Sequence, residues 1–270
     1  MIKANKYLTK LTESSSFSFI VLGDDNKRWV VRAKKKQKFS TRLFNEFTAG
    51  ILVSEIGFNK PKVESIKLTS EIISNAEKNH PESDNFEINS DIAVGTEYIE
   101  NLERIVPEDN SSIKNSVSYK NQLIRKFGVD YNFNPFYAYC VFAEWIFLRD
   151  KKYENLHVTT DLRPVFLDFD VSFTGLSYEH QIPDKYSLTV MISDNIFSEV
   201  IIWEKERFEV WLSNIQSCNK DKIKRLLTEI PQSWELPSGI RQKIIRTLLD
   251  NREQFIKEFM KFIKYKKNEI

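Results

Sequence analysis

Residues 142–156 read FAEWIFLRDKKYENL, and residues 165–170 read VFLDFD. In the first stretch an apolar run leads to Asp150, and Asn155 follows five positions later. In the second stretch a short apolar run ends at Asp168. The residues between the two have the pattern of a short hairpin. Such a hairpin would fold Asn155 and Asp168 back onto one site, so these stretches decide how the rest of the chain is interpreted.

Phosphoryl transfer uses side chains of these types. One carboxylate accepts or orients the proton of the attacking hydroxyl, while a second carboxylate and an amide hold Mg²⁺ against the nucleotide phosphates. Mg²⁺ prefers oxygen ligands and keeps several of its waters. Taken singly, each residue also has a structural interpretation, because Asp and Asn commonly serve turns. Their joint spacing beside an apolar strand favours a metal–nucleotide site.

The composition excludes several other kinds of site. The 270 residues include only seven Gly, so spaced that a Rossmann fingerprint, a Walker A loop and a nucleophile elbow are all absent. Two Cys and three His, far apart in sequence, do not readily supply a zinc site. Forty Lys and Arg oppose 38 Asp and Glu, and a formal net charge of +2 argues against broad nucleic-acid binding.

The same residues suggest a compartment. The first residues lack the apolar core of a signal peptide. The longest apolar run, 136–148, contains Glu144 and is too short to cross a bilayer. Two Cys do not make a disulfide framework. We therefore expect a cytoplasmic protein without membrane contact.

Hydrophobic periodicity divides the chain near residue 100. The expected fold class is α+β with two lobes, a small antiparallel β-rich lobe with one helix over 1–100 and a larger, mainly helical lobe over 101–270. In the first lobe we expect strands at 17–22, 28–33, 62–68 and 91–100, a helix at 41–56 ended by Gly57, and a polar loop or irregular hairpin at 70–90. In the second lobe we expect helices at 121–127, 135–148, 194–216, 219–230 and 238–265, an ambiguous segment at 106–120, and the hairpin at 157–169.

The catalytic stretch, with residues 165–173, resembles that of HipA-like kinases. These are bacterial protein kinases with a protein-kinase-like, two-lobed fold related to the phosphatidylinositol kinases. Weaker resemblances extend along most of the chain: 28–33 to the strand that carries the ATP-binding Lys, 42–52 to the Asn-Glu helix that supplies its carboxylate partner, 94–99 to the strand entering the hinge, and 230–252 to the C-terminal pattern.

The resemblance implies roles in catalysis and metal binding. Asp150 would be the catalytic base, and Lys152 would contact the γ-phosphate unless it is ordinary surface charge. Asn155 would be a metal ligand and Asp168 the main metal ligand. Asp170 could assist in binding the metal, although the position of Asp168 matches the family's metal ligand better. ATP and Mg²⁺ would be the cofactors.

The resemblance also implies a nucleotide site, with one departure. Glu46 would be the ion-pair partner on the first helix, and backbone groups around Tyr98 and Ile99 would receive adenine. Position 32 is Arg where the family usually has Lys, and the two are not interchangeable at such a site. Either Arg32 pairs with Glu46 and a phosphate, or Lys34 on the same strand face reaches in, or catalysis is weak.

The phosphate loop departs from the family as well. Residues 12–19, TESSSFSF, are Ser-rich where a Gly-rich loop is expected. If they cover phosphate, Ser15 and Ser16 contact it, and Ser14, Ser15, Ser16 and Ser18 are candidate autophosphorylation sites. Phosphorylation there would add roughly −1.5 to −2 charge and inhibit nucleotide binding. The alternative is a polar turn before a strand.

Together with the resemblance, these observations predict an ATP- and Mg²⁺-dependent Ser/Thr protein kinase, and the resemblance implies the HipA-like type; the Ser-rich loop adds a capacity for autophosphorylation. The resemblance adds a toxin or effector setting, a protein substrate, and an antitoxin or regulator on a separate chain. No nucleic-acid partner is expected for this chain alone. Two alternatives stay open: a pseudokinase that binds nucleotide or a partner, favoured by Arg32 and the Gly-poor loop, and a kinase of a small molecule or lipid.

Overall fold

The computed structural model describes most of the chain. None of the helices in this part is long and apolar enough to span a bilayer. The described residues are 1–11, 18–33, 41–80, 88, 90–104, 116–128, 133–148, 151, 155–173, 186, 201–231, 234 and 239–269.

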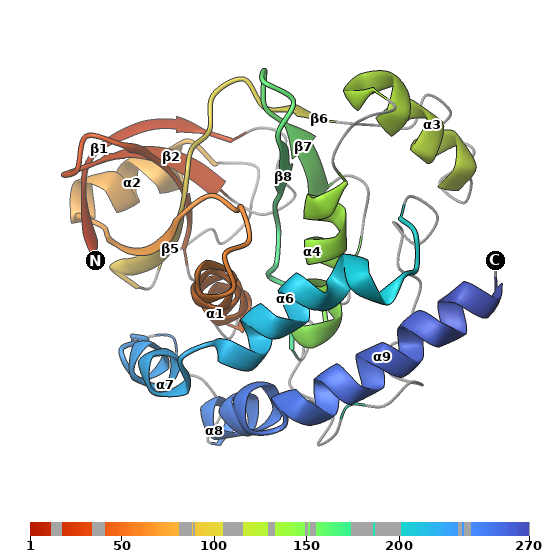
Figure 1. Cartoon of the computed structure of the whole chain (residues 1–270). Coiled ribbons are helices and arrows are strands. Elements are labelled where there is room, and N and C mark those ends of the chain that lie inside the picture. The colour runs from red at the N-terminus through yellow and green to blue at the C-terminus, as the bar shows by residue number, and fades with distance from the viewer. Residues whose placement is uncertain are drawn as a thin grey trace.

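Five strands from the first hundred residues close into a barrel (Figure 1). The order around the barrel is β1-β2-β3-β5-β4. The strands are β1 (Ile2–Lys10), β2 (Ser18–Gly23), β3 (Arg28–Arg32), β4 (Val63–Lys67) and β5 (Ile92–Glu97). The hairpin of β2 and β3 and the strands β4 and β5 were predicted from their β-favouring composition.

The predicted antiparallel sheet is wrong in one respect. Strand β1, which the sequence pattern did not reveal, pairs antiparallel with β2 but parallel with β4, with Ile2 opposite Ile66. This parallel pair closes the barrel. Strand β1 carries Lys and other polar residues at most positions and only Ala4 is buried, so it has no alternating apolar pattern to detect.

A second correction concerns residues 70–90, predicted to be a loop or an irregular hairpin. Residues Ser70–Lys78 form helix α2, which adds a second helix to α1 among the described residues of the first lobe. The hydroxyl of Thr69 accepts the backbone N–H of Ile72 and caps the helix, and Ile72 and Ala76 are buried against the barrel. Two buried positions among polar residues were too weak a periodicity to predict the helix.

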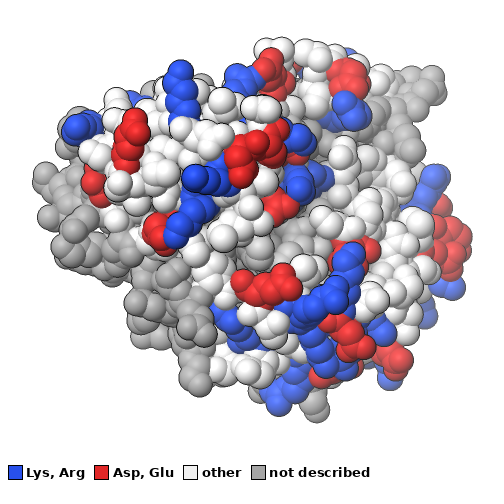
Figure 2. Space-filling view, turned by 90° about the vertical axis from the view of Figure 1, so that its left-hand side faces the viewer, with Lys and Arg blue, Asp and Glu red and all other residues white. Residues whose placement is uncertain are grey.

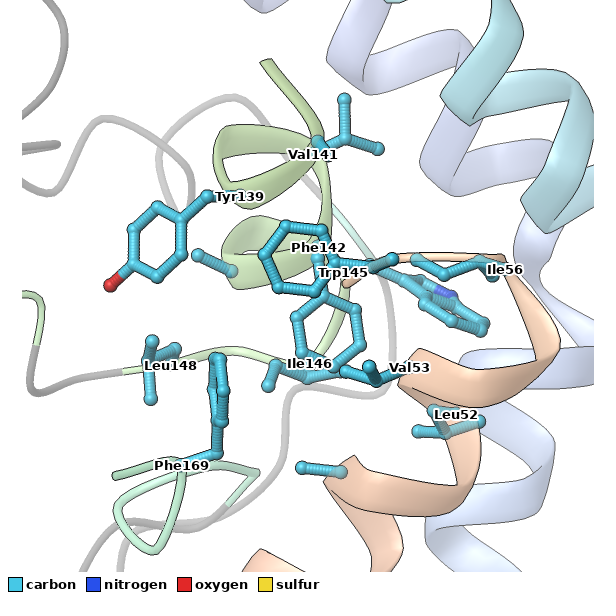
Figure 3. Close-up of a cluster of buried hydrophobic side chains, with 14 of the residues drawn as sticks. Leu52, Val53, Ile56, Tyr139, Val141, Phe142, Trp145, Ile146, Leu148 and Phe169 are labelled. Carbon is cyan, nitrogen blue, oxygen red and sulfur yellow. The ribbon is translucent and has the colours of Figure 1, made fainter. Parts of the chain in front are cut away.

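The first helix, α1 (Thr41–Glu55), lies between the barrel and the helices of the second half (Figure 1). It ends at Gly57, whose φ of +72° is the left-handed conformation that glycine adopts without strain. In Figure 3, Leu52 and Val53 of α1, and Ile56 just after its end, lie in one cluster with Phe142 and Trp145 on α4. These contacts belong to the larger of two hydrophobic cores, so α1 is fixed to the helical part of the molecule.

After residue 100 the described part of the chain consists of helices and a small three-stranded sheet. The sheet has the order β6-β7-β8, with β6 (Glu103–Arg104), β7 (Leu156–Val158) and β8 (Pro164–Phe166). The helices are α3 (Ser116–Phe127), α4 (Asn134–Trp145), α6 (Lys205–Ser217), α7 (Lys220–Thr228), α8 (Ile240–Ile245), the π-helical turn η3 (Arg246–Asp250) and α9 (Arg252–Glu269).

Helix α4 is the centre of this part. Every residue from Phe136 to Trp145 is buried, which explains its continuous apolar sequence. The hairpin of β7 and β8 is confirmed. The single helix expected over 238–265 is interrupted at η3, where Thr247, Leu248 and Leu249 are buried consecutively. The barrel-side face in Figure 2 shows Lys and Arg interspersed with Asp and Glu.

Candidate functional site

A charged cluster joins the barrel to the end of the β7–β8 hairpin. Arg32, the last residue of β3, points its guanidinium at two carboxylates: Nη1 lies 2.9 Å from Asp168 Oδ1 and 3.0 Å from Asp170 Oδ2. Arg42 on α1 lies 3.5 Å from the same Asp170 oxygen. Asp170 is buried, whereas Arg32 and Asp168 are partly accessible.

Burial and charge shift the pKa values of this cluster. Burial raises the pKa of Asp170 to about 7; Arg32 opposes the shift, and Asp168 adds to it. Burial acts in the same direction on Asp168, but Arg32 and a hydrogen bond with Asp170 bring its pKa below the ordinary value. Burial would lower the pKa of Arg32, yet the two carboxylates and Glu46 raise it overall. Arg32 therefore stays charged.

The cluster shows how Arg32 is paired. Pairing with Glu46 and a phosphate was one of three possibilities for Arg32; in the structure Arg32 pairs with Asp168 and Asp170, and Glu46 pairs with Lys60. Strand alternation does hold, because Trp29 and Val31 point into the barrel and Arg32 points out of it. The alternative cation, Lys34, lies outside the described residues.

Helix α1 holds the backbone of the segment that carries both Asp residues. Asn45 Nδ2 donates to the carbonyls of Asp170 and Ser172, each at 2.8 Å. Glu46 Oε2 accepts the backbone N–H of Phe169 at 2.8 Å. These contacts support Asp168 at a φ of +63°, a left-handed conformation that is costly outside glycine and persists only when its surroundings impose it. In Figure 3 the Phe169 ring points into the core near Leu148.

Sequence reasoning missed Lys60. This residue lies in the loop between α1 and β4, and its side chain is only 1% exposed. Its Nζ lies 2.7 Å from Glu46 Oε1 and 4.4 Å from the centre of the Phe169 ring. Burial lowers its pKa, and Glu46 opposes the shift. No sequence signal separates Lys60 from Lys62 two positions later, whose side chain is 56% exposed.

The hairpin brings Asn155 next to the Asp168 segment. In the β7–β8 pair Leu156 lies opposite Phe166, and the N–H of Leu167 donates to the carbonyl of Asn155 at 2.9 Å. Asn155 is thus one residue from Asp168 across the hairpin, as the spacing predicted.

The predicted base, Asp150, and Lys152 lie outside the described residues. Two residues close to Asp150 in sequence, Leu148 two positions before it and Lys151 directly after it, are held in place. Leu148 N–H donates to the Ala143 carbonyl, and Lys151, buried, pairs with Glu144.

The end of β5 approaches the same hairpin. The N–H of Tyr98 donates to the carbonyl of Arg28 at 2.9 Å, so this amide, one of the groups expected to receive adenine, is already engaged. Ile99 lines a cavity of about 410 Å³ whose size is within the range of small-molecule sites. The cavity is lined by Ser54, Asn59, Lys60, Pro61, Lys62, Glu97, Ile99, Thr159, Arg163 and Val165.

The Ser-rich segment is described only at its end. Ser18 begins β2, opposite Arg32, and is 1% exposed, so phosphorylation there requires β2 to open. The other candidates, Ser14, Ser15 and Ser16, lie outside the described residues.

The residues present fit a divalent cation. Asp168 and Asp170 aim oxygen atoms at one positive group, the Arg32 guanidinium, and converging carboxylate oxygens are the ligands Mg²⁺ prefers. Within the described ranges no cluster of three or more His, Cys, Asp or Glu forms a metal site. Asn155, whose backbone lies beside the Asp168 segment across the hairpin, carries a further side-chain oxygen of the type Mg²⁺ binds, and waters would complete the coordination.

Comparisons with known proteins identify the fold. No protein-family model matches the sequence, and no curated protein matches it either. Among solved structures, the Helicobacter pylori proinflammatory kinase CtkA is similar with a TM-score of 0.59 and 10% identity, covering 96% of each chain. The Golgi casein kinase is similar with a TM-score of 0.52 and 14% identity, covering 99% of this chain and 75% of its own.

A second structure of the Golgi casein kinase, with Mn/ADP bound, has a TM-score of 0.50 and 13% identity, covering 96% of this chain and 73% of its own. At these identities the likeness concerns the fold alone. The chain has a kinase-like fold over nearly its whole length.

Proposed function

We propose that this chain is an ATP- and Mg²⁺-dependent protein kinase directed at Ser or Thr. The observation that carries the proposal is the Arg32–Asp168–Asp170 cluster, which lies beside Asn155 in a kinase-like fold. Two carboxylates, an amide and a cationic side chain are what a nucleotide triphosphate with its metal requires. The HipA-like type, autophosphorylation and a toxin or effector setting rest on the sequence resemblance alone.

In this proposal each residue has a defined task. Asp150 accepts the proton of the acceptor hydroxyl, a contribution of roughly 10²–10⁴-fold in rate. Asn155 and Asp168 hold Mg²⁺, which supplies positive charge against the nucleotide phosphates. Arg32 leaves the two carboxylates and contacts a phosphate through its planar fork of donors. A protein substrate and a regulator on a separate chain are the expected partners.

The test is transfer of the γ-phosphate from ATP to protein, including the chain itself, at saturating Mg²⁺. Asp150→Asn and Asp168→Asn are expected to abolish transfer, with nucleotide binding retained better in the first. Asp161→Asn is a matched control, because Asp161 lies in the turn of the same hairpin and pairs with Arg163 at the surface. Full activity in either of the first two variants would refute the proposed roles.

A pseudokinase is the second candidate, and the pairing of Arg32 with both carboxylates favours it. An Arg that stayed there would occupy the position that the proposal gives to the metal. The two candidates differ in metal-dependent consumption of ATP: a kinase produces ADP, and a pseudokinase binds ATP without turnover.

A further inference from the structure

A buried lysine connects the first helix to the segment of Asp168. The side chain of Lys60 is 1% exposed, and that of its partner Glu46 is 4% exposed. Lysine is almost never buried unless its charge is paired, because desolvating an ammonium group is costly. Two contacts compensate Lys60: an ion pair of 2.7 Å with Glu46 and a cation–π contact of 4.4 Å with Phe169.

Both contacts connect Lys60 to Phe169, the residue that follows Asp168. The two carboxylate oxygens of Glu46 accept from different donors: Oε1 accepts from Lys60 Nζ, and Oε2 accepts the backbone N–H of Phe169 at 2.8 Å. The ammonium group of Lys60 therefore fixes the orientation in which Glu46 accepts the Phe169 amide. The same ammonium group lies over the Phe169 ring. Lys60 thus acts on this residue at its backbone and at its side chain.

This peptide sets the direction of the Asp168 carboxylate. The Phe169 amide belongs to the peptide bond that follows Asp168, whose φ of +63° needs support from its surroundings. Asn45 secures the chain further along, at Asp170 and Ser172, but does not contact this peptide. Losing the Glu46 contact would allow the Asp168 backbone to relax.

The positive charges around the site are therefore divided. Lys60 neutralises Glu46, and Arg32 neutralises the Asp168–Asp170 pair. If Arg32 were the ion-pair partner of Glu46, its movement to a phosphate would leave the buried Glu46 carboxylate unpaired, which is strongly unfavourable. Because Lys60 supplies the charge for Glu46, a move of Arg32 to a phosphate would leave Glu46 paired. The charge of Asp168 and Asp170 would then be met by the metal proposed at this site and by Arg42, which lies 3.5 Å from Asp170.

We infer that Lys60 is a positioning residue for the metal site. Through Glu46 and Phe169 it holds Asp168 in its metal-binding orientation, and by pairing with Glu46 it leaves Arg32 to the nucleotide. This inference rests on the proposed function. Residues that orient metal ligands typically change metal affinity by about 10–100-fold when mutated.

The experiment compares Lys60→Met, Lys60→Arg and Lys151→Met with the unaltered protein. Lys151→Met breaks another buried Lys–Glu pair and serves as the control for lost stability. The first readout is the Mg²⁺ concentration at half-maximal ADP formation. The second is deuterium exchange of backbone amides in the peptide that covers residues 167–172, measured without metal at a temperature where all variants are folded.

Lys60→Met is expected to raise the half-saturating Mg²⁺ concentration at least about tenfold and to accelerate exchange of the peptide. Lys60→Arg retains the charge and should recover most of both values. Lys151→Met should change neither. A purely structural Lys60 would lower the folded fraction, and hence the maximal rate, with an unchanged Mg²⁺ dependence; that result overturns the inference.

If Lys60→Met does not fold, Glu46→Gln/Lys60→Met removes both charges, a change that buried pairs often tolerate. Here the inference predicts a folded protein whose 167–172 amides still exchange faster than in the unaltered protein. If this double variant is stable and both its amide exchange and its Mg²⁺ dependence equal those of the unaltered protein, the inference is overturned. If the unaltered protein transfers no phosphate, the proposed function fails, and the exchange readout alone decides the role of Lys60.

Discussion

Replacing Asn45 by Ala tests how the Asp168 segment is held. Asn45 is 1% exposed, and its amide donates to two carbonyls, those of Asp170 and Ser172, each at 2.8 Å. A buried acceptor left without a donor costs about 1–3 kcal/mol, so two give about 2–6 kcal/mol. We expect Asn45→Ala to lower the free energy of unfolding by about 3 kcal/mol, since some relaxation will occur.

The matched control is Asn214→Ala. Its amide donates once, at 2.9 Å, to the carbonyl of Ile56, at a partly buried position away from the Asp cluster. One hydrogen bond is worth about 1 kcal/mol. Both variants are compared by urea unfolding, and each is assayed for the Mg²⁺ concentration at half-maximal activity. Asn45→Ala should raise that concentration, and Asn214→Ala should not. A loss for Asn45→Ala no larger than for the control would refute the reasoning.

Three further predictions concern the frame around the site. Gly50→Ala should destabilise by about 2 kcal/mol in thermal or urea unfolding, because the new methyl would lie 2.6 Å from Val63 Cβ and overpacking outweighs the helix-propensity gain; unchanged stability would contradict the close approach of α1 and β4. Phe166→Ala should cost about 3–5 kcal/mol, since its ring stacks on Tyr139 at 4.4 Å and is buried; a loss below 1 kcal/mol in the same assay would count against this core. Burial raises the pKa of the Cys218 thiol, so a smaller fraction is thiolate at pH 8 than for an ordinary cysteine, and alkylation at that pH should be slower in native protein than in denaturant; equally fast native labelling would show the thiol to be exposed.

Local patterns predicted the parts of the fold that local forces determine. The β2–β3 hairpin follows from two β-favouring runs around a turn, and α1 from apolar residues at helical spacing. The end of α1 at Gly57 follows from its left-handed φ. The spacing of Asn155 and Asp168 indicated their meeting, because a short hairpin leaves few other arrangements.

The remaining features depend on partners distant in sequence. Pairing of β1 with β4 joins residues about sixty positions apart, and nothing in β1 itself indicates it. Lys60 cannot be told from an exposed lysine until the fold places Glu46 and Phe169 around it. The preference of Arg32 for two carboxylates over Glu46 likewise depends on how the hairpin approaches the barrel.

A crystal structure of the protein with Mn²⁺ and a non-hydrolysable ATP analogue tests the proposed metal–nucleotide site most directly, because anomalous scattering locates the metal. We expect one Mn²⁺ held by Asn155 and Asp168, with the Arg32 guanidinium moved from the carboxylates to a phosphate. Arg32 still bound to both Asp168 and Asp170, with no metal beside them at saturating Mn²⁺ and nucleotide, would contradict it.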